Sequence, residues 1–232
     1  MKLASCPVAP QSQVDLLPGP TPDAQLVQAC TLSDVPGVRA ALAAGADVHT
    51  RSGRGCTPLH LACTGKNEPK LEIAALLIAA GGRVNTANDD GVVPLHWAAS
   101  YGHQAMAELL LRHGADLRLA DHEGQTALLG AVFNSDTALV DLLLSKGASP
   151  QAARRDGGTP LHAAALLQKR EMVLQFCPLV DEQFLGEVSL VCQAHGRDEM
   201  HALLQASLAL KAVENFLMNH PASSPCIKSL HP

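Results

Sequence analysis

Three histidines stand at one position of a recurring phrase, and imidazole side chains can bind a metal or carry protons. They are His60, His96 and His162, and each follows a Pro-Leu pair. A zinc site needs three or four such ligands to converge on one point. Because each copy of the phrase belongs to a different unit of the chain, we expect these histidines to lie at least one unit apart. The pattern therefore indicates structural hydrogen bonds rather than a metal site.

Other residues with reactive side chains lack the partners that catalysis needs. Cys56 is expected just before a helix, a position that lowers the pKa of a thiol, but no base accompanies it. Asp89 and Asp90 are adjacent in a turn and do not face each other across a cleft. Residues 53–55 (Gly-Arg-Gly) lack the remainder of a phosphate-binding loop. The sequence therefore predicts no enzyme, no cofactor and no metal.

The phrase that contains the histidines is written four times at nearly constant spacing. Its first residues are Thr57, Val93, Thr126 and Thr159, which are 36, 33 and 33 residues apart. Glycines that close an apolar run keep the same step, at Gly45, Gly81, Gly114 and Gly147. Self-similarity at this period is typical of stacked helical units, each of which buries its apolar face against a neighbour.

Each unit is predicted to hold two helices. Thr57 can cap the first helix, Pro58 suits its first position, and His60 can reach back to the Thr57 backbone as in a capping box. The second helices are expected at residues 71–78, 105–111 and 138–144 and end near glycine. Turn-forming residues such as those at 88–91 then favour a short projecting hairpin.

Three departures interrupt this regularity. Extra residues around 66–70 favour a longer loop between the helices of the second unit. Val93 replaces the capping threonine of the third unit, which we expect to weaken that cap by about 1 kcal/mol. Ala127 and Leu129 replace proline and histidine in the fourth unit, which makes it the least regular.

Phrase, glycine and period together resemble the ankyrin-repeat family over about residues 21–178. The resemblance implies an all-α fold, an ankyrin-repeat α-solenoid of helix-turn-helix units with short β-hairpin or loop fingers. The first repeat is expected to have a helix over 24–32, capped by Thr21 or Asp23, and a second over 36–43.

The expected domain layout follows from the resemblance and from composition. A Pro- and Ser-containing arm at 1–20 and a tail at 221–232 are expected to be disordered. Between them we expect an ankyrin domain over 21–184, then a degenerate repeat and C-terminal capping helix over 185–220. In that last part helices are predicted at 187–193, at 198–204 and, as a separate amphipathic helix, at 207–218. The five ankyrin repeats are expected at 21–50, 51–85, 86–118, 119–151 and 152–180.

The family resemblance also implies a binding surface, the concave face made by the finger tips and the exposed side of each first helix. Transferred to this chain, it places exposed charged, polar or apolar residues at these positions: Arg54, Asp89, Asp90, Val92, Tyr101, His122, Glu123, Gln125, Phe133, Asn134, Arg155, Asp156, Leu166 and Leu167. Tyr101, Phe133 and the two leucines would form an apolar strip below charged tips.

The same residues have a purely structural interpretation. Phe133 and Leu167 can pack against neighbouring helices, and the tip charges can simply face water. Trp97 fits partial burial in the stack as well as contact with a partner.

The function that the resemblance implies is a non-enzymatic scaffold, adaptor or inhibitor that binds another protein. An alternative comes from the C-terminal helix, where Ser207, Leu208, Ala212 and Phe216 resemble the elongin-binding box of ankyrin proteins that recruit cullin ubiquitin ligases. That box normally has cysteine where Ala212 stands, and no Leu-Pro-rich segment follows. A capping helix is the other interpretation of this segment.

Composition limits the remaining possibilities. The net charge of −5 and the sequence pI near 6.1 offer no general attraction for nucleic acid. The N-terminus lacks a signal-peptide pattern and no stretch is apolar enough for a membrane span, so we expect no membrane association. Seven cysteines without a Cys-x-x-Cys pair favour reduced thiols, as in the cytosol or nucleus. We expect the chain to be a monomer by itself.

Overall fold

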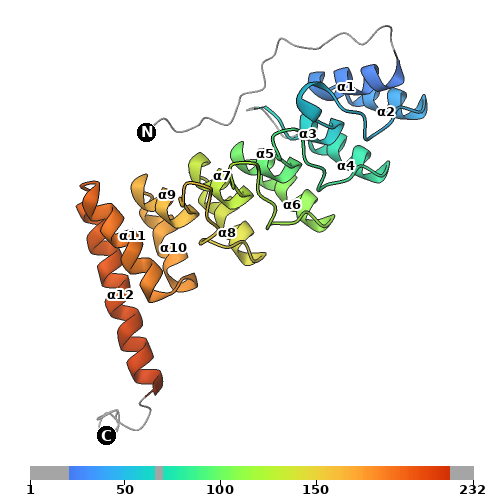
Figure 1. The fold of residues 1–232 in the computed structure, drawn as a ribbon. Coiled ribbons are helices and arrows are strands. Elements are labelled where there is room, and N and C mark those ends of the chain that lie inside the picture. Colours follow the sequence, from blue (N-terminus) through green and yellow to red (C-terminus); the bar gives the residue numbers. More distant parts are fainter. Residues whose placement is uncertain (1–20, 66–69, 220–232) are drawn as a thin grey trace, which may run out of the picture. The chain divides into compact units, whose positions relative to one another are not determined.

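The computed structural model describes residues 21–65 and 70–219, which form two compact units divided between Pro160 and Leu161. The predicted arm at 1–20, the inserted loop at 66–69 and the predicted tail at 221–232 lie outside the described residues. The first unit is a series of helical hairpins (Figure 1). Its helices are α1 (Pro22–Leu32), α2 (Val35–Ala43), α3 (Pro58–Ala62), α4 (Leu71–Ala79), α5 (Pro94–Ser100), α6 (Gln104–Arg112), α7 (Ala127–Asn134) and α8 (Thr137–Ser145).

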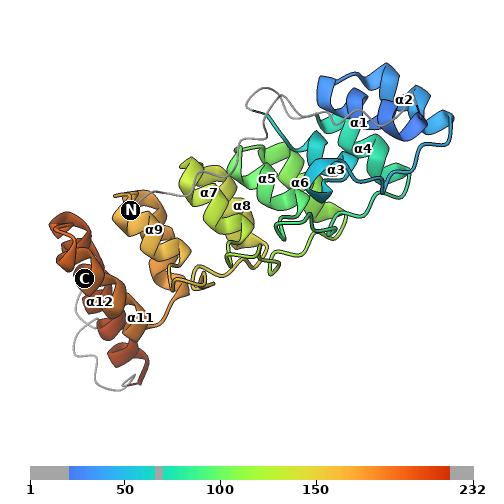
Figure 2. The ribbon, with the colours of Figure 1, turned by 45° about the horizontal axis from the view of Figure 1, so that its top comes forward.

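The helices of this unit form two rows. The first helices pack in succession, α1 on α3, α3 on α5 and α5 on α7, and the second helices α2, α4 and α6 do the same (Figures 1 and 2). Each first helix also packs on the second helix of its own repeat. The all-α repeat solenoid predicted from the phrase and its period is therefore confirmed.

Small residues let the first helices come close together. The first-helix positions that face neighbours are buried leucines and alanines, including Leu59, Ala62, Leu95, Ala98 and Leu128. At Gly130 an added Cβ would lie 2.7 Å from the Ser100 hydroxyl oxygen, so a larger residue there would have to displace that hydroxyl between α7 and α5.

The helix caps follow the phrase. Thr21 caps α1, and its hydroxyl accepts from the Ala24 N–H at 3.2 Å. His60 Nδ1 accepts from the Thr57 N–H at 3.1 Å, as the capping box predicts. His96 Nδ1 accepts from the Val93 N–H at 3.2 Å, so the imidazole half of the cap persists where valine has replaced threonine.

Lys70 joins the first two repeats, a contact that the sequence did not indicate. Its ammonium donates to the carbonyl oxygens of Cys30 at 2.6 Å, Thr31 at 3.1 Å and Leu61 at 3.3 Å. These carbonyls lie in the last turns of α1 and α3, where a helix leaves acceptors without intrahelical partners.

The fingers between repeats are loops closed by turns. Within the described residues no strand forms, and an isolated antiparallel bridge joins Ala120 to Thr126. A 3₁₀ turn, η1 (Gly53–Gly55), forms the finger of the second repeat.

The second unit contains α9 (Pro160–Leu166), whose first residue lies at the division, then α10 (Arg170–Phe176), the 3₁₀ turn η2 (Cys177–Leu179), α11 (Glu182–Ala194) and α12 (Asp198–Asn219). Figure 1 shows α12 beside α11, and the two helices pack on each other. The separate helices predicted at 198–204 and 207–218 are one continuous helix of 22 residues. Leu204 to Ser207 contain no proline or glycine, so nothing in that stretch ends the helix.

Candidate functional site

Successive fingers of the first unit are joined by backbone hydrogen bonds. The Asp89 N–H donates to the Arg54 carbonyl oxygen at 3.0 Å, and the His122 N–H donates to the Asp90 carbonyl oxygen at 3.0 Å. The Arg155 N–H donates to the Glu123 carbonyl oxygen at 3.0 Å. The predicted tip residues of four fingers are thus brought into one row.

The charges on these fingers pair with one another. Arg54 lies 4.0 Å from Asp90, and Arg154 lies 3.7 Å from Glu123 and 3.4 Å from Asp156. Such exposed or partly exposed pairs contribute about 0–1 kcal/mol each and are screened by salt. Part of the finger charge is therefore paired inside the stack itself, which leaves less of it for a partner.

Two predicted binding residues on the fingers serve the fold. The Val92 carbonyl oxygen lies 2.9 Å from His60 Nε2. The Gln125 amide donates to Asp121 Oδ2 at 3.2 Å and to Glu123 Oε2 at 3.1 Å. Both side chains are half-buried, whereas those of Arg54, Asp89, His122, Glu123, Arg155 and Asp156 are exposed.

A group of half-buried aromatic residues lies on the row of first helices. Trp97 belongs to α5, Tyr101 follows it directly as its C-cap, and Phe133 belongs to the neighbouring α7. The Trp97 ring meets the His60 ring edge-to-face at 5.8 Å, and Tyr101 stacks on His103 at 5.8 Å. These contacts hold the rings in place while part of each remains accessible.

Asn134 is brought next to Tyr101. Its side-chain nitrogen lies 2.3 Å from the place that a Cβ of Gly102 would occupy, and Gly102 has a φ of +72°. Glycine suits this position because its φ would strain any side chain, and an added Cβ would also displace the exposed Asn134 amide. Leu166 and Leu167 are half-buried in the second unit, so the predicted four-residue apolar strip stays a prediction.

The recurring histidines hold backbone groups together. Because His60 Nδ1 accepts from a backbone N–H and Nε2 faces a carbonyl oxygen, the ring is neutral with its proton on Nε2. Burial lowers the pKa of His60 to about 4. His96 Nε2 lies 2.9 Å from the Leu119 carbonyl oxygen, and burial also lowers its pKa. The hydrogen-bonding interpretation is confirmed for these two residues.

The pKa of Cys56 is shifted in the direction opposite to the one expected for a thiol just before a helix. Burial is the largest influence on this thiol and raises its pKa, although Asn88 donates to the sulfur at 3.5 Å. Burial also raises the pKa of Cys30 to about 12. These thiols are therefore poor nucleophiles in the folded chain.

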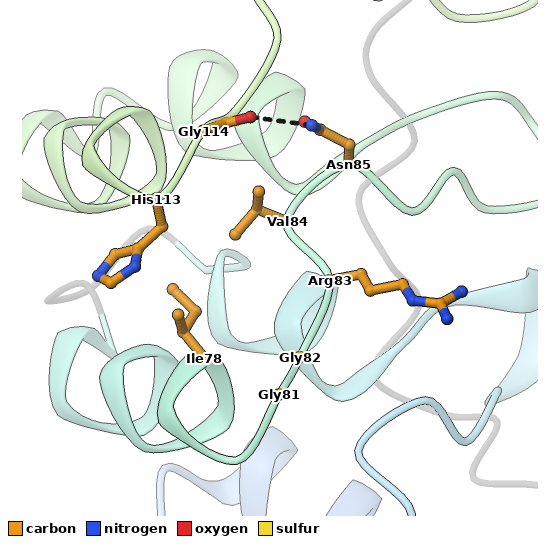
Figure 3. Close-up of a pocket in the computed structure, with 8 residues that line it drawn as sticks. All are labelled: Ile78, Gly81, Gly82, Arg83, Val84, Asn85, His113 and Gly114. Carbon is orange, nitrogen blue, oxygen red and sulfur yellow. Dashed lines mark hydrogen bonds between the residues drawn. The ribbon is translucent and has the colours of Figure 1, made fainter.

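A shallow hollow of about 450 Å³ lies where α4 and α6 end (Figure 3). Ile78 and Val84 point toward its interior near His113, whereas Arg83 points away (Figure 3). The Asn85 amide spans its edge and donates to the Gly114 carbonyl oxygen at 2.9 Å. No carboxylate or thiol lines it, and in the part of the chain that the structure describes no group of three or more His, Cys, Asp or Glu residues could hold a metal.

A model of the family described as ankyrin repeats (3 copies) matches residues 26–121 and 114–183. With the helical hairpins described above, this match establishes that the chain belongs to the ankyrin-repeat family. No curated protein matches the chain. Among the described helices, none has both the length and the apolar character to cross a lipid bilayer.

The ligase alternative, which depends on residues of the C-terminal helix, stays a prediction. Ser207 and Leu208 are half-buried and Ala212 is exposed, while the side chain of Phe216 lies outside what the structure describes. Trp97 was not among the predicted binding residues. The signal that could have singled it out is composition, because the sequence has one tryptophan and one tyrosine and both lie at α5.

Proposed function

We propose that this chain is a non-enzymatic scaffold, adaptor or inhibitor that binds a partner protein through its fingers and first helices. The contact would centre on Trp97, Tyr101 and Phe133. The observation that carries the proposal is that the only Trp and Tyr of a chain with 3% aromatic residues are both partly accessible at α5. Tryptophan and tyrosine are enriched among the residues that dominate binding energy.

The finger charges have a secondary part in this proposal. Since Arg54, Asp90, Glu123 and Arg154 already pair within the stack, a partner gains little affinity by matching them. Asp89 and Asp156 also pair, with Arg51 and Arg154. Exposed His122 and Arg155, with Asn134 beside Gly102, would favour register and association rate. Leu166 and Leu167 extend the proposed surface only if the second unit contributes to the same partner.

A pair of matched variants tests this surface. Tyr101→Ala with Phe133→Ala removes two proposed anchors, and Leu109→Ala removes a half-buried apolar side chain from α6 in the other row of helices. We expect the double variant to lose at least about tenfold in affinity for a partner isolated with the wild-type chain, the scale of a binding anchor. Leu109→Ala should bind normally. Equal affinity of all three proteins, with unchanged circular dichroism, would reject this face.

Compartment and oligomeric state belong to the same proposal. The free, buried Cys30, Cys56, Cys63, Cys177 and Cys192 support a reducing compartment, the cytosol or the nucleus. The proposed resting state is a monomer, and light scattering on the purified chain measures it directly.

The ligase alternative remains a second proposal with its own measurement. It predicts that elongins copurify with the full chain and are lost when residues 207–232 are removed. Retention of a partner through Trp97 and Tyr101 after that truncation would favour the scaffold.

A further inference from the structure

A different apolar surface lies on the second unit. Leu179, Leu210 and Val213 are 54%, 61% and 55% exposed, although each is a large aliphatic residue. We propose that these three residues, the C-terminal patch, dock an amphipathic helix that carries lysine or arginine beside its apolar residues. This contact is independent of the surface at α5.

The patch lies on a side of α12 that does not pack against the rest of the unit. Met200 and Leu204 are buried, and with half-buried Ser207 they make the side that packs within the unit. Leu210 follows Leu204 by six residues, which places it about two-thirds of a turn away at 3.6 residues per turn. Val213 is three residues further and therefore shares the side of Leu210.

Leu179 is held at the same end of the unit. The Lys211 ammonium donates to the Val180 carbonyl oxygen. Lys211 follows Leu210 and Val180 follows Leu179, so this contact joins the two segments. This contact brings η2 to the half of α12 that carries Leu210 and Val213, so exposed aliphatic side chains occur on both elements at that end of the unit.

Carboxylates at this end of the unit make an acidic rim. Glu214 follows Val213 directly and is exposed. Glu182, at the start of α11, accepts from the Asn215 amide at 2.5 Å, so its carboxylate is held beside α12. Asp181 adds a further carboxylate at this corner, where it caps α11. The nearby cation, Lys211, already points at a carbonyl oxygen.

The acidic charge near the patch decides which of two possible partners fits it. A second copy of this chain would bring acidic rims together, which is unfavourable, whereas a basic amphipathic segment would pair with them. A helix fits better than an extended strand, because the backbone groups of α12 are used inside the helix and offer no edge for strand pairing.

The test uses two labelled 15-residue peptides with the same helical leucine stripe, one flanked by lysines and the other by glutamates. Fluorescence anisotropy with the full chain should give at least tenfold tighter binding for the lysine peptide. Leu210→Ser with Val213→Ser should weaken it at least tenfold, and Glu182→Gln with Glu214→Gln should weaken it and reduce its salt dependence. Tyr101→Ala with Phe133→Ala should leave it unchanged.

Three results would overturn the proposal: no binding of the lysine peptide, equal binding of both peptides, or binding that survives Leu210→Ser with Val213→Ser. Self-association of the full chain that these two substitutions abolish would show that a second copy is the occupant instead. Because Leu210 and Val213 are more than half exposed, circular dichroism should confirm that the variant with both serines folds.

Discussion

His60 Nε2 lies 2.9 Å from the carbonyl oxygen of Val92, the residue that precedes the first-helix phrase of the next repeat. The other ring nitrogen caps α3 by accepting from the Thr57 N–H. A single imidazole therefore starts one helix and joins two repeats, and it does both only while it is neutral.

Acid should loosen this joint. The pKa of His60 is about 4 in the folded chain and 6.5 ordinarily, so between these values the unfolded chain binds the proton more readily. The contribution of neutral His60 to the free energy of unfolding is therefore complete above about pH 6.5, and it falls as the pH drops toward 4. For His60 we expect a loss of about 2 kcal/mol at pH 5 relative to pH 7.5. Burial lowers the pKa of His96 and His162 as well, which adds in the same direction.

Urea unfolding at the two pH values measures this effect. His60→Leu copies the residue found at the same phrase position in the fourth repeat, Leu129, and should reduce the pH dependence while lowering stability at pH 7.5. His113→Leu, at an exposed position, should retain the wild-type dependence. An unchanged pH dependence in His60→Leu would contradict the assigned tautomer and burial.

The phrase threonines should respond in opposite ways to loss of the hydroxyl. The Thr57 hydroxyl lies 2.9 Å from His60 Nδ1, whereas the buried Thr126 hydroxyl has no hydrogen-bond partner in the structure. Leu129 stands where the histidine would be. Thr57→Val should lower the free energy of unfolding by about 1 kcal/mol, and Thr126→Val should leave it unchanged or raise it. Urea denaturation of both variants checks this, and a larger loss for Thr126→Val would refute it.

Removing the Lys70 ammonium should detach the first repeat. Lys70→Met leaves three carbonyl oxygens without this donor, at a cost of about 1–3 kcal/mol. Hydrogen exchange should accelerate mainly in α1 and α2. Arg39→Met is the control, because Arg39 makes an exposed pair with Glu72 worth about 0–1 kcal/mol. Equal hydrogen-exchange rates in both variants would argue against a stabilising role of the Lys70 hydrogen bonds.

Buried cysteines should resist thiol reagents. In a Cys6→Ser, Cys226→Ser variant, the five remaining thiols are the buried ones. Since burial raises the pKa of Cys30 and Cys56, we expect little reaction with a disulfide reagent at pH 8 and full reaction after unfolding. Rapid reaction of the native variant would show that these sites open easily.

The repeat framework was predictable because its signals are local. Threonine, proline and the Nδ1 atom of histidine at the phrase act within one helical turn, and Leu59 or Ala98 need only a neighbouring helix to be buried. The finger pairs were not predictable, since Arg54 and Asp90 meet only after two repeats stack. The Lys70 contact depends on stacking in the same way.

The predicted break between two C-terminal helices was wrong for a different reason. The repeat pattern encouraged a break after Leu204, but the residues there favour a helix and α12 continues to Asn219. The exposed Leu210 and Val213 lie on the part of this helix that follows.

Photo-crosslinking in cells tests whether a partner protein contacts the first-helix surface. A benzophenone amino acid replaces Tyr101 in one protein and exposed Ala75 of α4 in another, and each is irradiated in cells. A partner at this surface should give a discrete protein adduct from position 101 and none from position 75. An adduct from position 75 alone would contradict it, as would no adduct from position 101 when the isolated complex remains intact.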